Sequence, residues 1–211
     1  MWSDIAYYAT LAFESAIGIF GVRLYEEPRY EVLARLGERL EIRRYAPRLA
    51  AEVVLPRAGR AETDDAFRLL FAYIAGANQD GETRAAKLAM TVPVEVRGND
   101  KLAMTAPVQV SEADGAVRML FYLPKKYSAD SAPKPTDERV RLVSVPSETV
   151  AALRYSGPSD NFGLRRSELM NLLKESLWRP TGTPYQLSYD PPFTLPFLRR
   201  NEAAVAVDQR P

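Results

Sequence analysis

The chain has 211 residues, which is enough for one well-buried domain. Its 28 Lys and Arg residues nearly balance 27 Asp and Glu residues, so it lacks the excess positive charge typical of nucleic-acid-binding proteins. The sequence contains neither Cys nor His. This excludes disulfides, thiol nucleophiles, iron–sulfur clusters and Ser-His-Asp catalysis, and it removes the commonest metal ligand of proteins.

Residues 5–24 form an apolar stretch near the amino terminus. A signal peptide begins with a basic region, but the first basic residue here is Arg23. A membrane-spanning helix would carry Glu14 near its centre, which costs about 2.5–3.5 kcal/mol. The apolar side chains follow helical spacing at Ile5, Tyr8, Ala9, Ala12, Phe13, Ala16, Ile17 and Phe20. We therefore expect an amphipathic helix over residues 1–26 that docks on the body of the protein, on a second subunit or on a lipid surface.

After this segment the sequence pattern changes from helical to β-type. Three short runs rich in strand-forming residues are separated by turn formers, at residues 30–36, 40–45 and 49–55. A helix is predicted next, with Thr63 as its N-cap and Gly76 at its end. Asp64 and Asp65 then lie in its first turn, where the helix dipole favours negative charge.

Two nearly identical octamers follow, KLAMTVPV at residues 87–94 and KLAMTAPV at residues 101–108. In each octamer the apolar side chains occupy even-numbered positions, which is the period of a half-buried strand. Residues 97–100, between the octamers, are rich in turn formers. The sequence therefore predicts a β-hairpin made of the two octamers.

The register of this hairpin follows from its apolar face. Both sets of even-numbered residues share one face if Arg97 pairs with Lys101, and Met104 then lies opposite Val94. This register separates Met90 from Met104 by roughly 13 Å along the strands. The two methionines can line one pocket, but they are badly placed to ligate one atom together.

The second half of the chain repeats this order of elements. A strand and turn pattern at residues 138–155 echoes residues 38–55, and a helix beginning near Asp160 ends before Arg179-Pro180. Further strands are predicted at residues 117–123 and 185–189. We predict an α+β fold: a distorted antiparallel β-barrel or curved sheet of two pseudo-repeated halves with two flanking helices, plus the N-terminal helix. A cleft between the halves is the natural place for a ligand.

Several short stretches resemble those of one known family. They are, in chain order, EPRYEV at 27–32, EIRRY at 41–45, YIAGAN at 73–78, the two MTxPV copies, KPTD at 134–137, YDPP at 189–192 and RRNE at 199–202. Together they resemble the SOUL haem-binding proteins. The resemblance implies a SOUL-like haem-binding domain over residues 27–205 and a carboxy-terminal tail over residues 206–211. It also implies a distorted barrel of two halves with two flanking helices, in agreement with the pattern above.

The resemblance further implies non-enzymatic binding of haem or a related tetrapyrrole, for transport, buffering or delivery. Haem is a flat apolar disc with two propionates, so it needs an apolar slot with cations at the rim. The expected cofactor-binding residues are Phe67, Arg68, Leu70, Phe71, Ile74, Lys87, Met90, Lys101, Met104, Met119 and Phe121. One branch of the family uses a histidine ligand, which this chain lacks, so we expect weak or no axial ligation, no metal-ligating residue and no catalytic residue. Ordinary core packing is an alternative explanation for the same helix face and methionines.

Two other functions stay open at this point. Relatives of the fold include effector-binding domains and hydrolases that use a carboxylate and a tyrosine in the cleft. The candidates for such a role are Tyr45, Tyr73, Tyr122, Tyr155, Glu52 and Glu148. Alternatively, the N-terminal helix makes the protein an interaction module through self-association or peripheral membrane contact. The leading expectation is a cytoplasmic binding protein whose partner is a small tetrapyrrole and not a nucleic acid.

Overall fold

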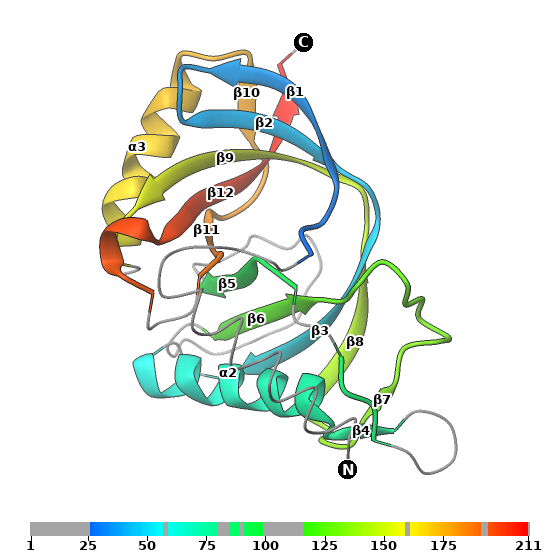
Figure 1. Ribbon diagram of the computed structural model, residues 1–211. Helices are drawn as coiled ribbons and strands as arrows, with labels where there is room; N and C mark the ends of the chain where they lie inside the picture. The colour runs from blue at the N-terminus through cyan, green and yellow to red at the C-terminus, as the bar shows by residue number, and fades with distance from the viewer. Residues whose placement is uncertain are drawn as a thin grey trace, which may run out of the picture.

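The computed structural model describes residues 26–56, 59–79, 85–88, 91–98, 116–158, 161–190 and 194–210. These residues form one large antiparallel sheet, a small two-stranded sheet and two α-helices (Figure 1). Nine strands of the large sheet curl into a half-barrel. The predicted α+β class and curved sheet are confirmed, whereas the predicted N-terminal helix falls on residues outside the described part.

The strands of the large sheet are β1 (Tyr30–Leu36), β2 (Leu40–Tyr45), β3 (Arg48–Leu55), β5 (Val94–Gly98), β6 (Val117–Tyr122), β8 (Val140–Val145), β9 (Glu148–Ser156), β10 (Trp178–Pro180), β11 (Tyr185–Ser188) and β12 (Arg200–Gln209). The small sheet pairs β4 (Asn78–Gln79) with β7 (Lys134–Pro135). The helices are α2 (Arg60–Ala75), α3 (Phe162–Lys174) and a 3₁₀ turn, η2 (Pro196–Leu198). None of the helices in these residues has the length and apolar character needed to cross a membrane.

The order of strands shows how the two halves combine. Across the sheet the order is β1-β2-β9-β12-β11-β5-β6-β3-β8, and β10 pairs with β12. Strands β2, β3, β5 and β6 of the first half correspond to β8, β9, β11 and β12 of the second half. When each strand is replaced by its counterpart, the order from β2 to β8 becomes the same order read backwards. The predicted pseudo-repeat is therefore present, with its approximate two-fold between β5 and β11. The halves also exchange one strand each: β2 of the first half pairs with β9 of the second, and β8 of the second half pairs with β3 of the first.

The two helices cover one face of the sheet. Helix α2 packs on β3 and β6, and α3 packs on β9, β10 and β12, so each helix covers its own half as the sequence predicts. Under α2 the strands contribute Val53 and Met119, and under α3 they contribute Leu153 and Val205. The helices lie on the outside of the curved sheet, so the opposite face lines the inside of the half-barrel (Figure 1). We call it the inner face.

Helix α2 begins earlier than the sequence predicts. Its N-cap is Gly59, and the hydroxyl of Thr63 donates a hydrogen bond to the Gly59 carbonyl oxygen at 2.8 Å. Thr63 is therefore inside the helix, and the acidic residue of the first turn is Glu62. At the other end the prediction is confirmed, because Gly76 caps the helix with φ of 123°, a backbone conformation that favours glycine.

Helix α3 ends earlier than the sequence predicts. Its last residue is Lys174, and Leu177 lies beyond it with 68 % of its surface exposed. The Arg179-Pro180 pair belongs to β10, where Pro180 pairs with Val207 at the edge of the sheet. Proline is accepted on edge strands because its missing N–H faces away from the ladder.

Strand β5 contradicts the predicted hairpin. Val94 pairs with Phe121 on one edge of β5 and with Ser188 on the other. Both edges are therefore occupied, and the predicted pairing of Val94 with Met104 is wrong. The second octamer itself, with Lys101 and Met104, lies outside the described residues.

Both ends of the described chain are tied to the sheet. The backbone carbonyl of Glu26 accepts a 3.0 Å hydrogen bond from the Val92 N–H, so the body of the protein includes Glu26. Strand β12 runs to Gln209, which pairs with Trp178. Residues 206–209, which the sequence analysis assigned to a tail, thus form the end of a strand.

Candidate functional site

Four of the predicted cofactor-binding residues form the core between α2 and β6. Leu70 and Ile74 point from the helix onto the sheet, and Met119 and Phe121 point up from β6. Each has 5 % or less of its surface exposed. They therefore lie against one another beneath the helix, on the opposite side of the sheet from the inner face.

Three other predicted residues lie at the outer side of α2. The Phe67 ring packs edge-on against Phe121 at 5.5 Å between centroids and stacks with the Phe71 ring at 6.1 Å. This series of rings leads from the core to the surface, where 38 % of Phe71 is exposed. Arg68 is exposed next to them and forms an ion pair with Asp65 one turn earlier. The structure thus brings an aromatic surface and a cation together on this helix.

The remaining predicted residues are only partly placed. Lys87 is half-buried. Met90, Lys101 and Met104 lie outside the described residues. A cofactor-binding role for the whole predicted set stays a prediction.

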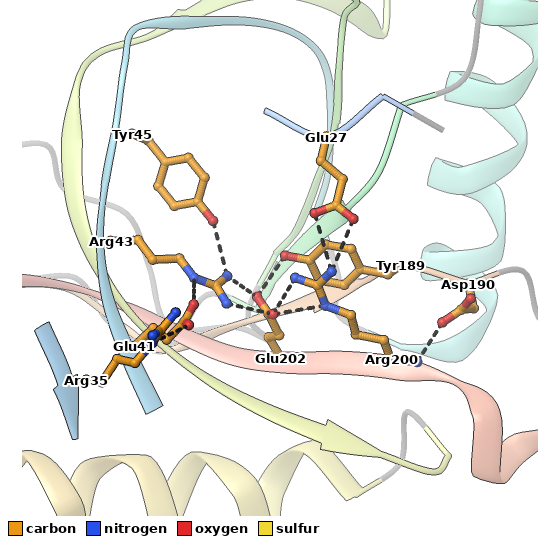
Figure 2. A network of polar contacts seen from close by, with 9 residues as sticks. All are labelled: Glu27, Arg35, Glu41, Arg43, Tyr45, Tyr189, Asp190, Arg200 and Glu202. Carbon is orange, nitrogen blue, oxygen red and sulfur yellow. Dashed lines mark hydrogen bonds and ion pairs between the residues drawn. The ribbon is translucent and has the colours of Figure 1, made fainter. Parts of the chain in front are cut away.

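The inner face carries a buried polar network that the sequence analysis did not predict (Figure 2). Its centre is Glu202 on β12, whose carboxylate accepts hydrogen bonds from Arg43 on β2 at 2.6 and 3.0 Å. Arg200 donates to the same carboxylate at 2.8 and 3.1 Å, and the Tyr189 hydroxyl donates at 2.7 Å. Arg200 also reaches Glu27 at 3.1 Å. This network joins the start of the described chain to strands of both halves.

Charge pairing keeps Glu202 ionised although it is fully buried. Burial alone would raise the pKa of Glu202, but the hydrogen bond and positive charge of Arg43, with the charge of Arg200, outweigh burial and hold the pKa below its usual value. The same pairing raises the pKa of Arg43. Burial raises the pKa of Tyr45, beside Arg43, to about 12. The network is therefore a fixed set of charges with a neutral phenol at its border.

A second cluster on the inner face surrounds Glu95 of β5. Glu95 has 1 % of its surface exposed, accepts a 2.5 Å hydrogen bond from the Tyr122 hydroxyl and pairs with Arg97. The Arg97 guanidinium lies over the ring of Tyr185 at 4.1 Å. Burial and the Glu95 charge raise the pKa of Tyr122 well above its usual value. This cluster therefore also holds a buried carboxylate that is both hydrogen-bonded and ion-paired.

Arg48, at the start of β3, links the two clusters. Its guanidinium lies between the rings of Tyr45 and Tyr122, at 4.2 and 4.5 Å from their centroids. It also forms an ion pair with Glu148. Three of the residues considered for hydrolysis, Tyr45, Tyr122 and Glu148, thus meet at one place.

The other residues considered for hydrolysis lie elsewhere. The Tyr73 hydroxyl donates to the Pro133 carbonyl at 2.8 Å. Tyr155 lies in the core under α3, and Glu52 pairs with Arg118. The structure therefore does not assemble the full predicted set into one site.

One pattern in the sequence does point to the charged residues of the inner face. Opposite charges two positions apart on a strand share one face of the sheet. The inner-face strands carry this pattern as Glu41 with Arg43, Glu95 with Arg97, and Arg200 with Glu202. Sequence reasoning missed it because charged strand residues are expected to face solvent.

A cavity of about 210 Å³ opens beside the inner face. It lies between residues 26–29, the turn from β2 to β3, and the residues that follow β6, and both Arg48 and Tyr122 line it. The described residues contain no cluster of three or more His, Cys, Asp or Glu side chains arranged to hold a metal ion. Within that part of the chain, the polar groups can therefore bind organic or ionic ligands but do not form a metal site.

A comparison with family models shows to which family the chain belongs. The model described as "SOUL heme-binding protein" matches residues 25–206, which is most of the chain. The chain belongs to the SOUL family. A comparison with curated proteins finds no match.

Solved structures share the fold of this SOUL protein at low sequence identity. The C-terminal domain of EcmrR is 11 % identical, with a TM-score of 0.59 over 85 % of this chain and 98 % of that domain. A hydrolase from Listeria innocua is 14 % identical, with a TM-score of 0.56 over 81 % of this chain and 92 % of that one. An uncharacterized conserved protein from Listeria innocua is 14 % identical, with a TM-score of 0.54 over 87 % of this chain and 93 % of that one. At these identities the likeness concerns the fold alone.

Proposed function

We propose that this SOUL protein binds haem or a related tetrapyrrole without enzymatic turnover and without histidine ligation, for transport, buffering or delivery. Membership of the SOUL family supports the ligand class. The absence of His and Cys from the sequence supports binding by apolar contact and charge, because these residues are the usual strong ligands of haem iron. The proposed partner is a small tetrapyrrole and not a nucleic acid, and the proposed location is the cytoplasm, with peripheral membrane contact as an alternative.

The observation that carries this proposal is the outer side of α2. Phe71, Ala72 and Ala75 are exposed there within one turn, and Arg68 lies three residues before Phe71. Small residues beside an aromatic ring offer a flat apolar surface, which suits a porphyrin disc. Arg68 is placed to meet a propionate, because it extends from the same face of the helix. The residues present therefore fit a tetrapyrrole held at the surface of α2.

The described methionine nearest this surface does not fit a role as iron ligand. Met119 has 2 % of its surface exposed and is packed in the core beneath α2. A bound haem would supply its own iron chemistry, but Phe71 and Arg68 would only position and orient the ring. We therefore propose that haem and iron-free protoporphyrin bind with affinities within about tenfold, or 1.4 kcal/mol.

The geometry favours binding over hydrolysis on the inner face. Glu95 accepts a hydrogen bond from Tyr122 and forms an ion pair with Arg97, and Glu148 is paired with Arg48. A general base needs a carboxylate oxygen within hydrogen-bond reach of the attacking water, and these carboxylates already accept hydrogen bonds from arginine side chains. This pairing supports a binding protein and not a hydrolase.

Titration of the full chain with haem and with protoporphyrin tests the proposal. We expect both to bind, and the Phe71→Ser variant to lose about tenfold in affinity for each because it removes the aromatic surface. Leu172→Ser is a matched control, because Leu172 is 42 % exposed on α3, where no tetrapyrrole is proposed. Equal affinities of Phe71→Ser and the unaltered chain would place the ligand elsewhere. A haem affinity hundreds of times that of protoporphyrin would show direct ligation of iron.

A further inference from the structure

The cavity beside the inner face is too small for a tetrapyrrole. Its volume is about 210 Å³. Pockets for drug-sized ligands measure about 300–1,000 Å³, whereas a cavity of about 150 Å³ is known to accept benzene. The cavity is therefore of the right size for a single-ring or similarly compact molecule. It is also formed by other elements than α2, so it is independent of the proposed tetrapyrrole surface.

Most of the cavity wall is apolar and stiff. The apolar lining residues are Pro28, Ala46, Pro47, Leu49, Leu123 and Pro124. The prolines have fixed backbone φ angles and no N–H group, so they present carbon and not hydrogen-bond donors. The two buried hydroxyls among the lining residues are already used, because Thr91 donates to the Tyr122 carbonyl and Tyr122 donates to Glu95. The wall thus suits a hydrocarbon ring or a short branched chain.

One buried cation in the wall has an unused donor. The Arg48 side chain is nine-tenths buried, and the rings of Tyr45 and Tyr122 fix its plane. One of its terminal nitrogens pairs with Glu148. Within the described part of the chain, its Nε atom has no hydrogen-bond partner. A buried N–H without an acceptor is unfavourable, so an acceptor group entering beside Arg48 would be stabilised there.

Three charged residues of the cavity lining, Glu26, Arg29 and Lys125, have no ion-pair partner among the described residues, and two of the three are positive. Glu26 accepts a hydrogen bond from the backbone N–H of Lys125, and Glu27 pairs with Arg200. Arg29 and the Lys125 ammonium are exposed at the cavity. The balance of available charge therefore favours an anion over a cation.

We propose that this cavity is a second ligand site, which binds a compact carboxylate of about the size of benzoate. The carboxylate meets Arg48 at the inner end, and the ring or short chain lies against the proline-rich wall. Arginine is suited to this role because its planar guanidinium matches the geometry of a carboxylate. Lys125 and Arg29 then draw the anion to the opening.

Isothermal titration of the full chain with three ring compounds of similar size tests the charge preference. Benzoate is the anion, benzamide its neutral counterpart and benzylammonium the cation. We expect benzoate to bind to one site at least tenfold more tightly than either of the others. Equal binding of benzoate and benzamide, or tighter binding of benzylammonium, would overturn the proposal.

Two kinds of variant locate the site. Ala46→Leu adds bulk at an exposed residue of the cavity lining and keeps Arg48 itself, and we expect it to lose benzoate binding at least tenfold. Lys125→Gln should weaken benzoate binding severalfold, whereas the control Lys134→Gln, on the exposed strand β7, should not. Near-ultraviolet circular dichroism checks that each variant is folded. Folded Ala46→Leu with unchanged benzoate affinity would refute the proposal, and haem titration of the same variant shows whether the tetrapyrrole surface is unaffected.

Discussion

Arg43 and Glu202 join the two halves of the protein across an intervening strand. Arg43 lies on β2 and Glu202 on β12, and both strands pair with β9, which separates them. Their side chains are 3 % and 0 % exposed, and two hydrogen bonds of 2.6 and 3.0 Å connect them. The ion pair therefore holds β2, a strand of the first half, against the strands of the second half.

The first prediction concerns the loss of this pair. Glu202→Gln removes the buried anion shared by Arg43 and Arg200 and leaves them only Glu41 and Glu27, and breaking a buried ion pair costs about 3–5 kcal/mol of unfolding free energy. Glu168→Gln is the control, because Glu168 pairs with Arg39 and Arg165 at the surface, where a pair contributes about 0–1 kcal/mol. Urea denaturation measures both. Similar losses in the two variants would mean that the buried network has no special role.

The second prediction is a loss of stability in acid. Burial alone would raise the pKa of Glu202 and of Glu41, but Arg43 outweighs burial and lowers both. Below the usual glutamate pKa of about 4.3, the unfolded chain therefore binds protons that the folded chain does not. Stability is fully present above that pH and falls as the pH drops through the lowered values. Urea denaturation between pH 6 and pH 3 should show this fall, and Glu202→Gln should reduce its slope.

The third prediction is a loss of stability in alkali. Burial raises the pKa of Tyr45 and of Tyr155 to about 12, and it also raises that of Tyr185 well above its usual value. The folded chain therefore retains protons that the unfolded chain loses above its tyrosine pKa of about 10. Stability is fully present below that pH and falls as the pH rises through the folded values. Tyrosinate absorbance should rise together with the loss of near-ultraviolet circular dichroism. A gradual rise with the fold intact would contradict the burial of these phenols.

The sequence predicts the strands of this fold better than their partners. Alternation and turn formers give β1 and β2 with their observed bounds, because a half-buried strand must alternate. Alternation shows which face a residue occupies, but it does not show which strand lies beside it. The exchange of β2 and β8 between the halves, and the pairing of β5 with β6 and β11, depend on long-range contacts.

The candidate site was predicted less well than the strands, because the spacing of residues does not show what they pack against. The apolar spacing that selected Leu70 and Ile74 is the same in a ligand slot and in a core, and these residues lie in the core. The inner-face residues Glu95 and Glu202 are charged, so their burial was not expected. Their burial is possible because arginines two positions away on the same strands neutralise them.

The fourth prediction compares a core residue beneath α2, Met119, with a surface residue of α2, Phe71. Met119→Ala removes buried volume from the core and should cost about 2–5 kcal/mol of unfolding free energy. Phe71→Ser acts on an exposed ring and should cost less than about 1 kcal/mol, while it weakens porphyrin binding. Thermal denaturation and porphyrin titration of both variants measure this contrast. A stable Met119→Ala variant that had lost only porphyrin affinity would move Met119 from the core into the binding site.

The last prediction concerns the amino-terminal segment. The Glu26 side chain accepts a 3.1 Å hydrogen bond from the Lys125 N–H, its carbonyl accepts one from Val92, and Glu27 pairs with Arg200. A chain truncated to begin at Glu26 keeps all three contacts, so we expect it to fold and to retain porphyrin affinity. It should lose self-association or lipid binding, because the apolar stripe of the preceding residues is removed.

A chain truncated to begin at Arg29 is the matched comparison, because it differs by only three residues but lacks the contacts of Glu26 and Glu27. The removal of Glu27 leaves Arg200 without one of its two anions, although Glu202 still holds it. We therefore expect this shorter chain to fold with an unfolding free energy about 1–3 kcal/mol lower, since all three contacts are lost. Urea denaturation and sedimentation of both chains measure stability and self-association separately. If the chain that begins at Glu26 were itself unfolded, the preceding residues would belong to the core, and their separation from the binding body would be refuted.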